Sequence, residues 1–284
     1  MNRVNKFTVS LLSLLISFSF FVTVSASSKN NESVSDMELL LFSGLCYANP
    51  DDNHSNVLNK DDFKRLQTSQ AFTTLLGPYV KDSDKVFSKL NNWEIVNSVI
   101  NKSNKSMAGF SAYTYKKGDC IVIAFRGTDG GIFRENWRYL IPFVEHPQIK
   151  YVKQYVDYIA NCNFINQNTK IYVTGHSLGG YLAMHSVHYI LHDSRLKDKF
   201  IKCDTFNSLG MRKTDNKDVL KTLSSLNDKQ MVNFQIRGDV VSKLGRHYPH
   251  AQVVSPAGKP ANGNFTKAHC IHMLFQFFPL FFTT

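Results

Sequence analysis

Residues 172–183 of this 284-residue chain read YVTGHSLGGYLA and contain a lone serine, Ser177, with glycine two positions before it and two positions after it. β-Branched residues lead into Gly175, and the residues after Gly179 are apolar with helical spacing, which predicts a strand that turns sharply into a helix at the serine. Glycine at both positions removes side chains that would collide where the strand and the helix approach each other. The pattern is typical of a nucleophile elbow, in which a strained turn presents a serine hydroxyl to a cleft.

Stretches typical of strands and of helices alternate around this turn. Three β-branched and aromatic stretches, separated by polar turns, predict antiparallel strands that lead into a buried one, at 93–100, 108–118 and 119–129. Alternation then predicts helices at 150–161, 178–192 and 218–226, and strands at 170–174, 200–206 and 231–237. Two earlier helices are expected, one with Ser35 or Asp36 as its N-cap and one over 61–76. This order predicts an α/β fold, with a mostly parallel central sheet and helices on both faces.

The N-terminal residues have the pattern of an export signal. Arg3 and Lys6 precede an apolar run from Phe7 to Val24, and the small residues that end at Ala26 resemble a cleavage site. The expected location is therefore secreted or periplasmic. An uncleaved signal would instead anchor the protein in a membrane, because the apolar run is close to the minimum length for a span.

The rest of the chain has the composition of one globular domain. Hydrophobic residues make up 43% and aromatic residues 13% of the chain, which is ordinary for a folded protein. We expect a signal peptide over 1–26, a polar linker over 27–34 and a single domain over 35–284, because no Pro- or Gly-rich segment divides the last range.

The charge is basic and the cysteines show no metal-ligand spacing. The formal net charge is +11, and it falls to +9 without the two basic residues of the signal, which leaves 31 basic against 22 acidic residues. Such a charge favours contact with anionic surfaces. The lysines are spread out and no nucleic-acid motif is present, so nucleic acid is not an expected partner. None of the five cysteines has zinc-ligand spacing, and Cys120 and Cys203 are expected to pack as small hydrophobic residues.

Five short motifs together resemble the class 3 lipases, which are α/β-hydrolases similar to the fungal triacylglycerol lipases. They are AFRGTD (124–129), NW (136–137), VTGHSLGGYLA (173–183), TFNSLG (205–210) and FQIRGDVVSKLG (234–245), in the order found in that family. The surrounding residues look more like the bacterial members than the fungal enzymes. The resemblance implies the α/β-hydrolase fold and an oxyanion hole built from Thr128 and from the backbone N–H of Leu178.

A serine nucleophile requires a base, and the base requires a carboxylate that orients it. In this fold the chain order is serine, acid, histidine. Asp239 follows an expected strand and matches the acid position of the family, so we favour it over Asp204, Asp215 and Asp228. The alternative for Asp239 is a purely structural role in the turn after Gly238.

Four histidines follow Asp239 in the sequence, and any of them can supply the base. His269 comes directly after a polar loop, as the late histidine of the family does, and is the favoured candidate. His272 lies about one helical turn further on and is the second candidate. His247 and His250 remain as third choices. A metal cluster of these two with Asp239 is not expected, because no helix places both rings on one side.

These residues predict a serine carboxylic ester hydrolase that needs no cofactor and no metal. Ser177 would attack the ester carbonyl, His269 would take its proton, Asp239 would hold the imidazole, and Thr128 and Leu178 would stabilise the oxyanion. An acylglycerol lipase is the favoured activity. The alternatives are a phospholipase A1-type enzyme on anionic membranes and a non-catalytic hydrolase-fold protein that binds membrane surfaces.

Two apolar segments suggest a lipid substrate and a transient contact with a membrane surface. Residues 130–143 occupy the position of the lid in the family, although ordinary core packing would explain their apolar side chains equally well. The last twelve residues, 273–284, are unusually aromatic but contain Pro279 and are too short to span a bilayer. They either pack on the sheet or touch a membrane surface.

Overall fold

The computed structural model describes residues 33–48, 88–100, 109–128, 146–248 and 251–253. The expected signal peptide, the helix expected at 61–76, the apolar segment 130–143 and the C-terminal segment 273–284 lie outside them. Within the described residues, no helix combines the length and the apolar character needed to cross a membrane.

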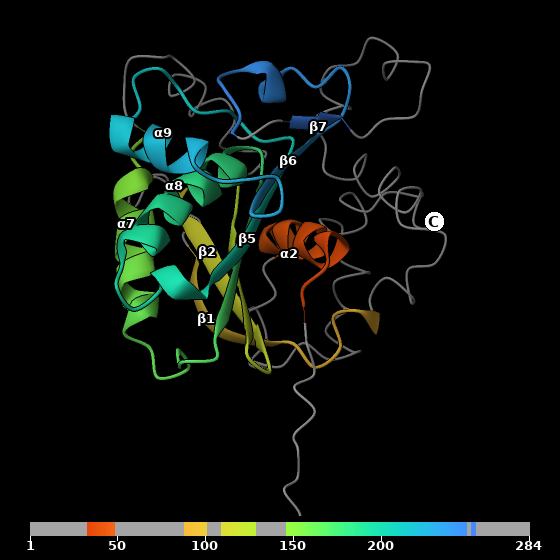
Figure 1. Ribbon diagram of the computed structural model, residues 1–284. Coiled ribbons are helices and arrows are strands. Elements are labelled where there is room, and N and C mark those ends of the chain that lie inside the picture. Colours follow the sequence, from red (N-terminus) through yellow and green to blue (C-terminus); the bar gives the residue numbers. More distant parts are fainter. Residues whose placement is uncertain (1–32, 49–87, 101–108, 129–145, 249–250, 254–284) are drawn as a thin grey trace, which may run out of the picture. The chain divides into compact units, whose positions relative to one another are not determined.

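A seven-stranded sheet forms the centre of the domain, and its strands lie side by side in sequence order (Figure 1). The first three strands pair antiparallel, and each pair from the third strand onward is parallel. The strands are β1 (Glu94–Ile100), β2 (Ser111–Lys117), β3 (Cys120–Phe125), β4 (Lys170–His176), β5 (Phe200–Phe206), β6 (Met231–Gln235) and β7 (Ala251–Val253). The predicted α/β class and the antiparallel start of the sheet are therefore confirmed. The short edge strand β7 was not predicted.

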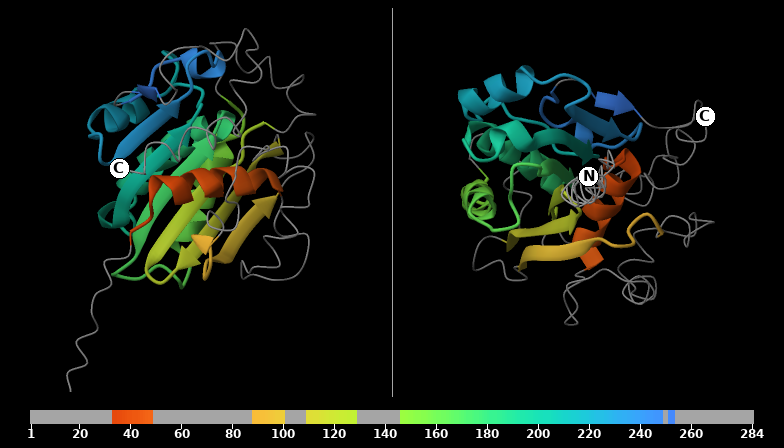
Figure 2. Two further views of the ribbon diagram at one scale, coloured as in Figure 1. Left: turned by 90° about the vertical axis from the view of Figure 1, so that its right-hand side faces the viewer. Right: turned by 60° about the horizontal axis from the view of Figure 1, so that its bottom comes forward.

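Helices cover both faces of this sheet, as predicted (Figure 2). On one face lies α2 (Asp36–Ala48), and on the other lie α7 (Ile149–Ala160) and α8 (Leu178–His192), with α9 (Lys217–Ser224) packed against α8. Alternate residues of β3 supply the two cores. Val122 packs in the core that contains α2, whereas Ile121 and Ile123 pack in the core that contains α7 and α8. This follows from the two-residue period of a strand and explains why β3 is apolar throughout.

A capping box starts α2. The Ser35 hydroxyl accepts the Glu38 backbone N–H at 3.3 Å, and the Glu38 carboxylate accepts the Ser35 backbone N–H at 2.9 Å. Of the two N-caps predicted, Ser35 is the one observed. The reciprocal bonds satisfy two backbone donors that the first turn of a helix otherwise leaves unpaired.

An ion-pair network ties the start of α2 to the sheet. The Lys202 ammonium on β5 pairs with Asp36, the first residue of α2, and lies 3.2 Å from the buried carboxylate of Asp204. Burial raises the pKa of Asp204 well above its usual value, although Lys202 opposes the shift. Burial also acts to lower the pKa of Lys202, but the two carboxylates outweigh it and the pKa is raised. The positive charge of Lys202 therefore compensates the negative charge of the buried Asp204 carboxylate.

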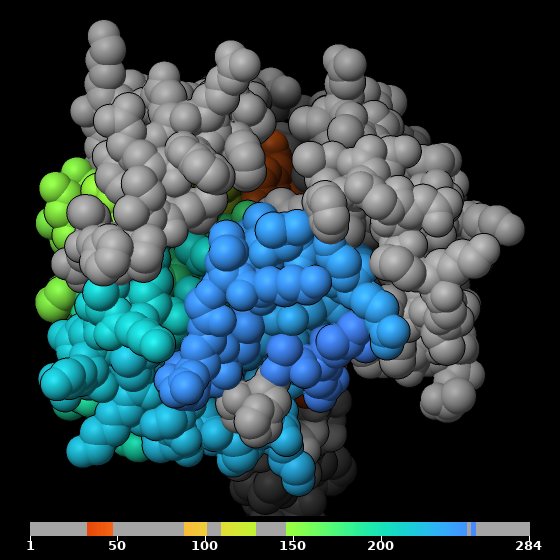
Figure 3. Space-filling view, turned by 90° about the horizontal axis from the view of Figure 1, so that it is seen from above, coloured from red at the N-terminus to blue at the C-terminus, as the bar shows by residue number. Residues whose placement is uncertain are grey.

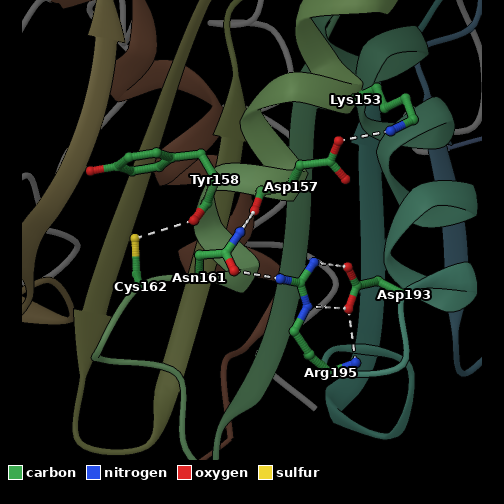
Figure 4. Close-up of polar contacts among 7 residues, drawn as sticks. All are labelled: Lys153, Asp157, Tyr158, Asn161, Cys162, Asp193 and Arg195. Carbon is green, nitrogen blue, oxygen red and sulfur yellow. Dashed lines mark hydrogen bonds and ion pairs between the residues drawn. The ribbon is translucent and has the colours of Figure 1, made fainter.

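A second polar network joins the C-terminal ends of α7 and α8 (Figure 4). The Arg195 guanidinium forms two bonds to the Asp193 carboxylate and donates to the Asn161 side-chain oxygen at 2.6 Å. The Asn161 amide in turn donates to the Asp157 carbonyl oxygen at 2.7 Å, near the end of α7. These contacts are exposed, so they define the geometry of the helix ends more than they stabilise the fold.

Four of the five cysteines lie in the described residues, and all four are free thiols. Cys120 and Cys203 are buried in the two cores, as predicted. Burial raises the pKa of the Cys203 thiol well above its usual value, so this sulfur packs as an apolar group and is not a reactive thiolate.

Candidate active site

The turn between β4 and α8 has the geometry of the predicted elbow. Ser177 alone separates the last residue of β4 from the first residue of α8, and its backbone angles are φ 59° and ψ −127°. A positive φ in a residue with a Cβ atom costs on the order of 1–3 kcal/mol and persists only where neighbouring contacts enforce it. Here the Ser177 N–H donates to the Phe206 carbonyl at 3.1 Å, and the Ser177 carbonyl accepts the Leu209 N–H at 3.2 Å.

The two glycines that flank the serine are required by close approach of backbone to backbone. A Cβ atom on Gly175 would lie 2.3 Å from the carbonyl carbon of Gly179. A Cβ atom on Gly179 would lie 2.1 Å from the carbonyl oxygen of Phe125, at the end of β3. Both distances are far below van der Waals contact, so strand, helix and neighbouring strand meet this closely only with glycine at both positions. This is the reason that the sequence pattern suggested.

The end of β3 lies directly beside the serine. In the parallel pairing of β3 with β4, Phe125 is opposite Gly175. Two residues later, a Cβ atom on Gly127 would lie 2.6 Å from the His176 carbonyl oxygen and 3.2 Å from Ser177 Cβ. The next residue, Thr128, is half-buried at the same edge of the sheet. Of the two predicted oxyanion-hole residues, Thr128 follows the end of β3 by three residues, and Leu178 is the first residue of α8, directly after Ser177.

Tyr47, which the sequence analysis did not single out, reaches the same edge from α2. Its hydroxyl oxygen accepts the Gly127 backbone N–H at 3.1 Å and lies 3.0 Å from His176 Nδ1. One phenol oxygen therefore joins the residue before Thr128 to the residue before Ser177. No local motif marks Tyr47, because its partners are 80 and 129 residues away in the chain.

Asp239 is fully buried in the turn after β6. One carboxylate oxygen accepts the Val241 N–H and the other accepts the Ser242 N–H, each at 3.0 Å. Both donors belong to the short helix η6 (Val241–Lys243), so the two hydrogen bonds fix the orientation of the carboxylate. Asp239 therefore makes the contacts of a structural turn residue, which is the alternative role that its sequence position suggested. In Figure 3, the segment after β6 (blue) lies on the face of the molecule that is turned toward the viewer.

The other candidate acids have different positions. Asp204 lies within β5 and not at its end. Asp215 accepts a hydrogen bond from the Tyr181 hydroxyl at 2.7 Å. Asp228 is exposed in the turn before β6. Asp239 follows β6, which is two strands from β4 in the sheet, so roughly 10 Å separates the two strands.

Of the four candidate bases, only His247 lies in the described residues; His250, His269 and His272 lie outside them. The His247 Nε2–H donates to the Ser242 carbonyl oxygen at 2.7 Å. Burial lowers the pKa of His247, whereas the Ser242 carbonyl and the nearby Asp239 oppose the shift. His247 therefore belongs to the environment of Asp239, with one ring nitrogen committed to a backbone oxygen.

Two further histidines are buried close to α8. The His185 ring packs edge-on against Tyr181 with ring centroids 4.6 Å apart, and neither of its ring nitrogens has a hydrogen-bond partner among the described residues. Burial lowers the pKa of His185 to about 3. Burial, and then the nearby Arg212, lower the pKa of His146 to about 3 as well. Both rings are therefore neutral at neutral pH. Within the part of the chain that the structure describes, no group of three His, Cys, Asp or Glu side chains is arranged to hold a metal ion.

Solved structures of lipases share the fold of this chain. A fungal lipase crystal structure matches 86% of this chain and 99% of its own, with 15% sequence identity and a TM-score of 0.52. M37 lipase matches 74% of this chain and 70% of its own, with 17% identity and a TM-score of 0.47. The lipase from Rhizopus microsporus var. chinensis matches 79% and 86%, with 14% identity and a TM-score of 0.44. At these identities the likeness concerns the fold.

Comparison of the sequence itself identifies the family. No curated protein matches the chain significantly. Residues 84–254, which include β1 to β7, Ser177 and Asp239, match the Mbeg1-like family. The chain therefore belongs to the Mbeg1-like family, and its domain has the α/β-hydrolase fold.

Proposed function

We propose that this protein is a serine carboxylic ester hydrolase that acts on lipid esters, with Ser177 as its nucleophile. The observation that carries the proposal is the backbone of Ser177, which has a positive φ at the junction of β4 and α8. Strain of this kind is retained where the surrounding structure enforces it, and it is found preferentially at functional sites. The segment that follows β3 also reaches the serine, because a Cβ atom on Gly127 would lie 3.2 Å from Ser177 Cβ.

The proposed reaction uses a triad of Ser177, His269 and Asp239. Ser177 Oγ attacks the ester carbonyl while His269 takes its proton, and the same proton then passes to the leaving alcohol. The developing oxyanion is stabilised by Thr128 and by the Leu178 N–H at the N-terminus of α8, where the helix dipole is favourable. Water then releases the acid from the acyl-enzyme. This role of Asp239 is supported by its burial and by the two backbone N–H groups that orient its carboxylate.

The substrate class is proposed on the lipase neighbours and on the sequence. An acylglycerol is the favoured substrate, and a phospholipid cleaved in the manner of phospholipase A1 is the alternative suggested by the basic charge. Export through the N-terminal signal, contact with a membrane surface and a closer relation to the bacterial members of the class 3 lipases are predictions from the sequence that belong to the same proposal.

A fluorophosphonate probe tests whether Ser177 is an activated nucleophile. The full chain should react with the probe, and Ser177→Ala should abolish both labelling and hydrolysis of a soluble p-nitrophenyl ester. Ser186→Ala is the matched control, because Ser186 is buried in the same helix and donates only to the Ala183 carbonyl. Labelling that persists in Ser177→Ala, or a wild-type chain that does not react, would refute the proposal.

The substrate and the base need separate measurements. Triacylglycerol emulsions and phospholipid vesicles, assayed side by side, distinguish the two lipid classes. For the base, His269→Gln should lower kcat as severely as Ser177→Ala, because members of a triad act as one unit. His272→Gln should cost far less. An inactive His272 variant beside an active His269 variant would reverse this assignment, and two active variants would transfer the role to His247 or His250.

A further inference from the structure

Two histidines face the same groove at the end of α8 remote from Ser177. His188 and His192 are one helical turn apart, and their rings pack with centroids 4.2 Å apart and planes inclined by 39°. They line a groove of about 640 Å³ whose wall also includes Lys153 of α7 and Thr222 of α9. His188 is half-buried and His192 is exposed. The length of α8 separates the pair from Ser177 by roughly 20 Å, so the groove is distinct from the proposed catalytic site.

The proton on His188 can be assigned from a chain of hydrogen bonds. The Thr222 hydroxyl donates to the Asp218 backbone carbonyl at 2.8 Å, as a threonine within a helix commonly does. Its single proton is thereby used, so Thr222 Oγ1 is an acceptor toward the His188 Nδ1 atom, which lies 2.9 Å away. His188 Nδ1 therefore carries a hydrogen, and in the neutral ring the lone pair is on Nε2.

The same tautomer follows for His192. Its Nδ1 atom lies 2.8 Å from the His188 backbone carbonyl, and a carbonyl oxygen can only accept. His192 Nδ1 is thus the donor, and the neutral ring again has its lone pair on Nε2.

We propose that His188 and His192 form a binding site for a divalent transition-metal ion of the Zn²⁺ and Cu²⁺ class. Each imidazole would bind the ion through Nε2, and water would complete the coordination. Imidazole is a preferred ligand of these ions. Metal-binding histidines usually donate their other ring nitrogen to a carbonyl or another acceptor, which sets the tautomer and the ring orientation. Both histidines have that arrangement before any ion is bound.

The charges of the groove suggest a competing ligand class, which the test has to separate. Lys153 and Lys221 both line the groove, and an anion would use them. Lys153, however, forms an ion pair with Asp157 at 2.7 Å, which partly compensates its charge (Figure 4). Asp218 adds a negative charge near His188. The balance favours a cation at the two imidazoles over an anion between the lysines.

Isothermal titration of the full chain with Zn²⁺ tests the proposal. The histidines that are not substituted are the same in every variant, so a change in zinc affinity can be assigned to the substituted residue. His188→Gln and His192→Gln should each remove the tightest zinc-binding step or weaken it at least about tenfold, since each removes one of two protein ligands. Thr222→Val removes only the hydroxyl that orients His188, and it should weaken zinc binding by about 10- to 100-fold. Lys221→Gln is the matched control and should leave zinc affinity unchanged or raise it. Mg²⁺, which prefers oxygen ligands, should not bind there.

The tautomers provide a second measurement that does not depend on affinity. Long-range ¹H–¹⁵N spectra of the histidine rings should show Nδ1–H and a lone pair on Nε2 for both residues, and Zn²⁺ should shift the Nε2 resonances. Zinc affinity that is unchanged in both histidine variants would overturn the proposal, and so would an Nε2–H tautomer at either ring. Phosphate binding that is lost in Lys221→Gln, in a chain that binds no zinc, would assign the groove to an anion instead. None of these readouts requires ester hydrolysis.

Discussion

Replacement of the buried His185 by leucine should make the protein more resistant to acid. The folded protein holds this ring neutral, with a pKa of about 3, whereas the unfolded chain has a pKa near the ordinary value of 6.5. Below pH 6.5 the unfolded state therefore binds a proton that the folded state does not bind. Stability is lost as the pH falls from 6.5 toward 3, and it is restored as the pH rises. Leucine has no such proton, so this loss disappears in the variant.

The size of the effect follows from the two pKa values. Each pH unit within this window costs the folded state about 1.4 kcal/mol per histidine. At pH 5, roughly 1.5 units below the unfolded pKa, the free energy of unfolding should fall by about 2 kcal/mol because of His185. This figure depends little on the folded pKa, because that value lies well below pH 5. Neither ring nitrogen has a partner among the described residues, so leucine should not lower stability at pH 7.

Urea unfolding followed by tryptophan fluorescence measures both quantities, and the buried Trp93 is a suitable reporter. The difference in unfolding free energy between His185→Leu and the wild type should grow by about 2 kcal/mol between pH 7 and pH 5. Ser186→Ala is the matched control, since it alters a neighbouring buried residue that does not titrate. A His185→Leu variant whose advantage is the same at both pH values would refute the reasoning, and would show that the ring is protonated or solvated in the folded protein.

Three further predictions concern the polar groups around the site and the core. Asp239→Asn should lower kcat/KM for a soluble ester by about 10⁴, because the amide favours the wrong imidazole tautomer; a near-normal rate with an intact circular dichroism spectrum would assign the acid elsewhere. Tyr47→Phe leaves the buried Gly127 N–H without its acceptor and should lower the free energy of unfolding by about 1–3 kcal/mol, whereas an unchanged urea midpoint would exclude a role for that bond. Lys202→Met leaves the Asp204 carboxylate buried without its cation, so it should destabilise the fold by about 3–5 kcal/mol at neutral pH. Because the raised pKa of Asp204 lets it take up a proton as the pH falls, the Lys202→Met loss should be smaller at pH 5, and a loss independent of pH would contradict this account.

The parts of the fold that the sequence predicted are those with a local periodic pattern. The helix at 178–192 was predicted with the bounds that the structure has, because glycine, strand and helix signals coincide at Ser177. The strand at 200–206 was likewise found with its observed bounds. The strand β7 has three exposed residues and pairs with β6 alone among the described strands, so its sequence carries no buried alternation that would mark it.

The parts of the candidate site that could be predicted are those whose residues all lie within one short sequence motif. The elbow is such a feature, because its glycines and its serine lie within five consecutive residues. Tyr47 was missed because its hydroxyl meets Gly127 and His176 only after α2 packs on the sheet. The unpartnered ring of His185 was missed for a similar reason. Its position on a helix is evident from the sequence, but the lack of a partner depends on every element that packs against it.

The position of α2 has a consequence for the design of fragments. The family match begins at residue 84, after this helix has ended. Yet Leu39, Leu40 and Phe42 of α2 are fully buried in the core against the sheet. A recombinant fragment trimmed to 84–254 would therefore expose an apolar sheet face to water and would be expected to aggregate. It would also lack the Tyr47 phenol that accepts the Gly127 N–H beside Ser177. The smallest soluble and active piece of this protein should begin before Ser35, at the capping box that starts α2.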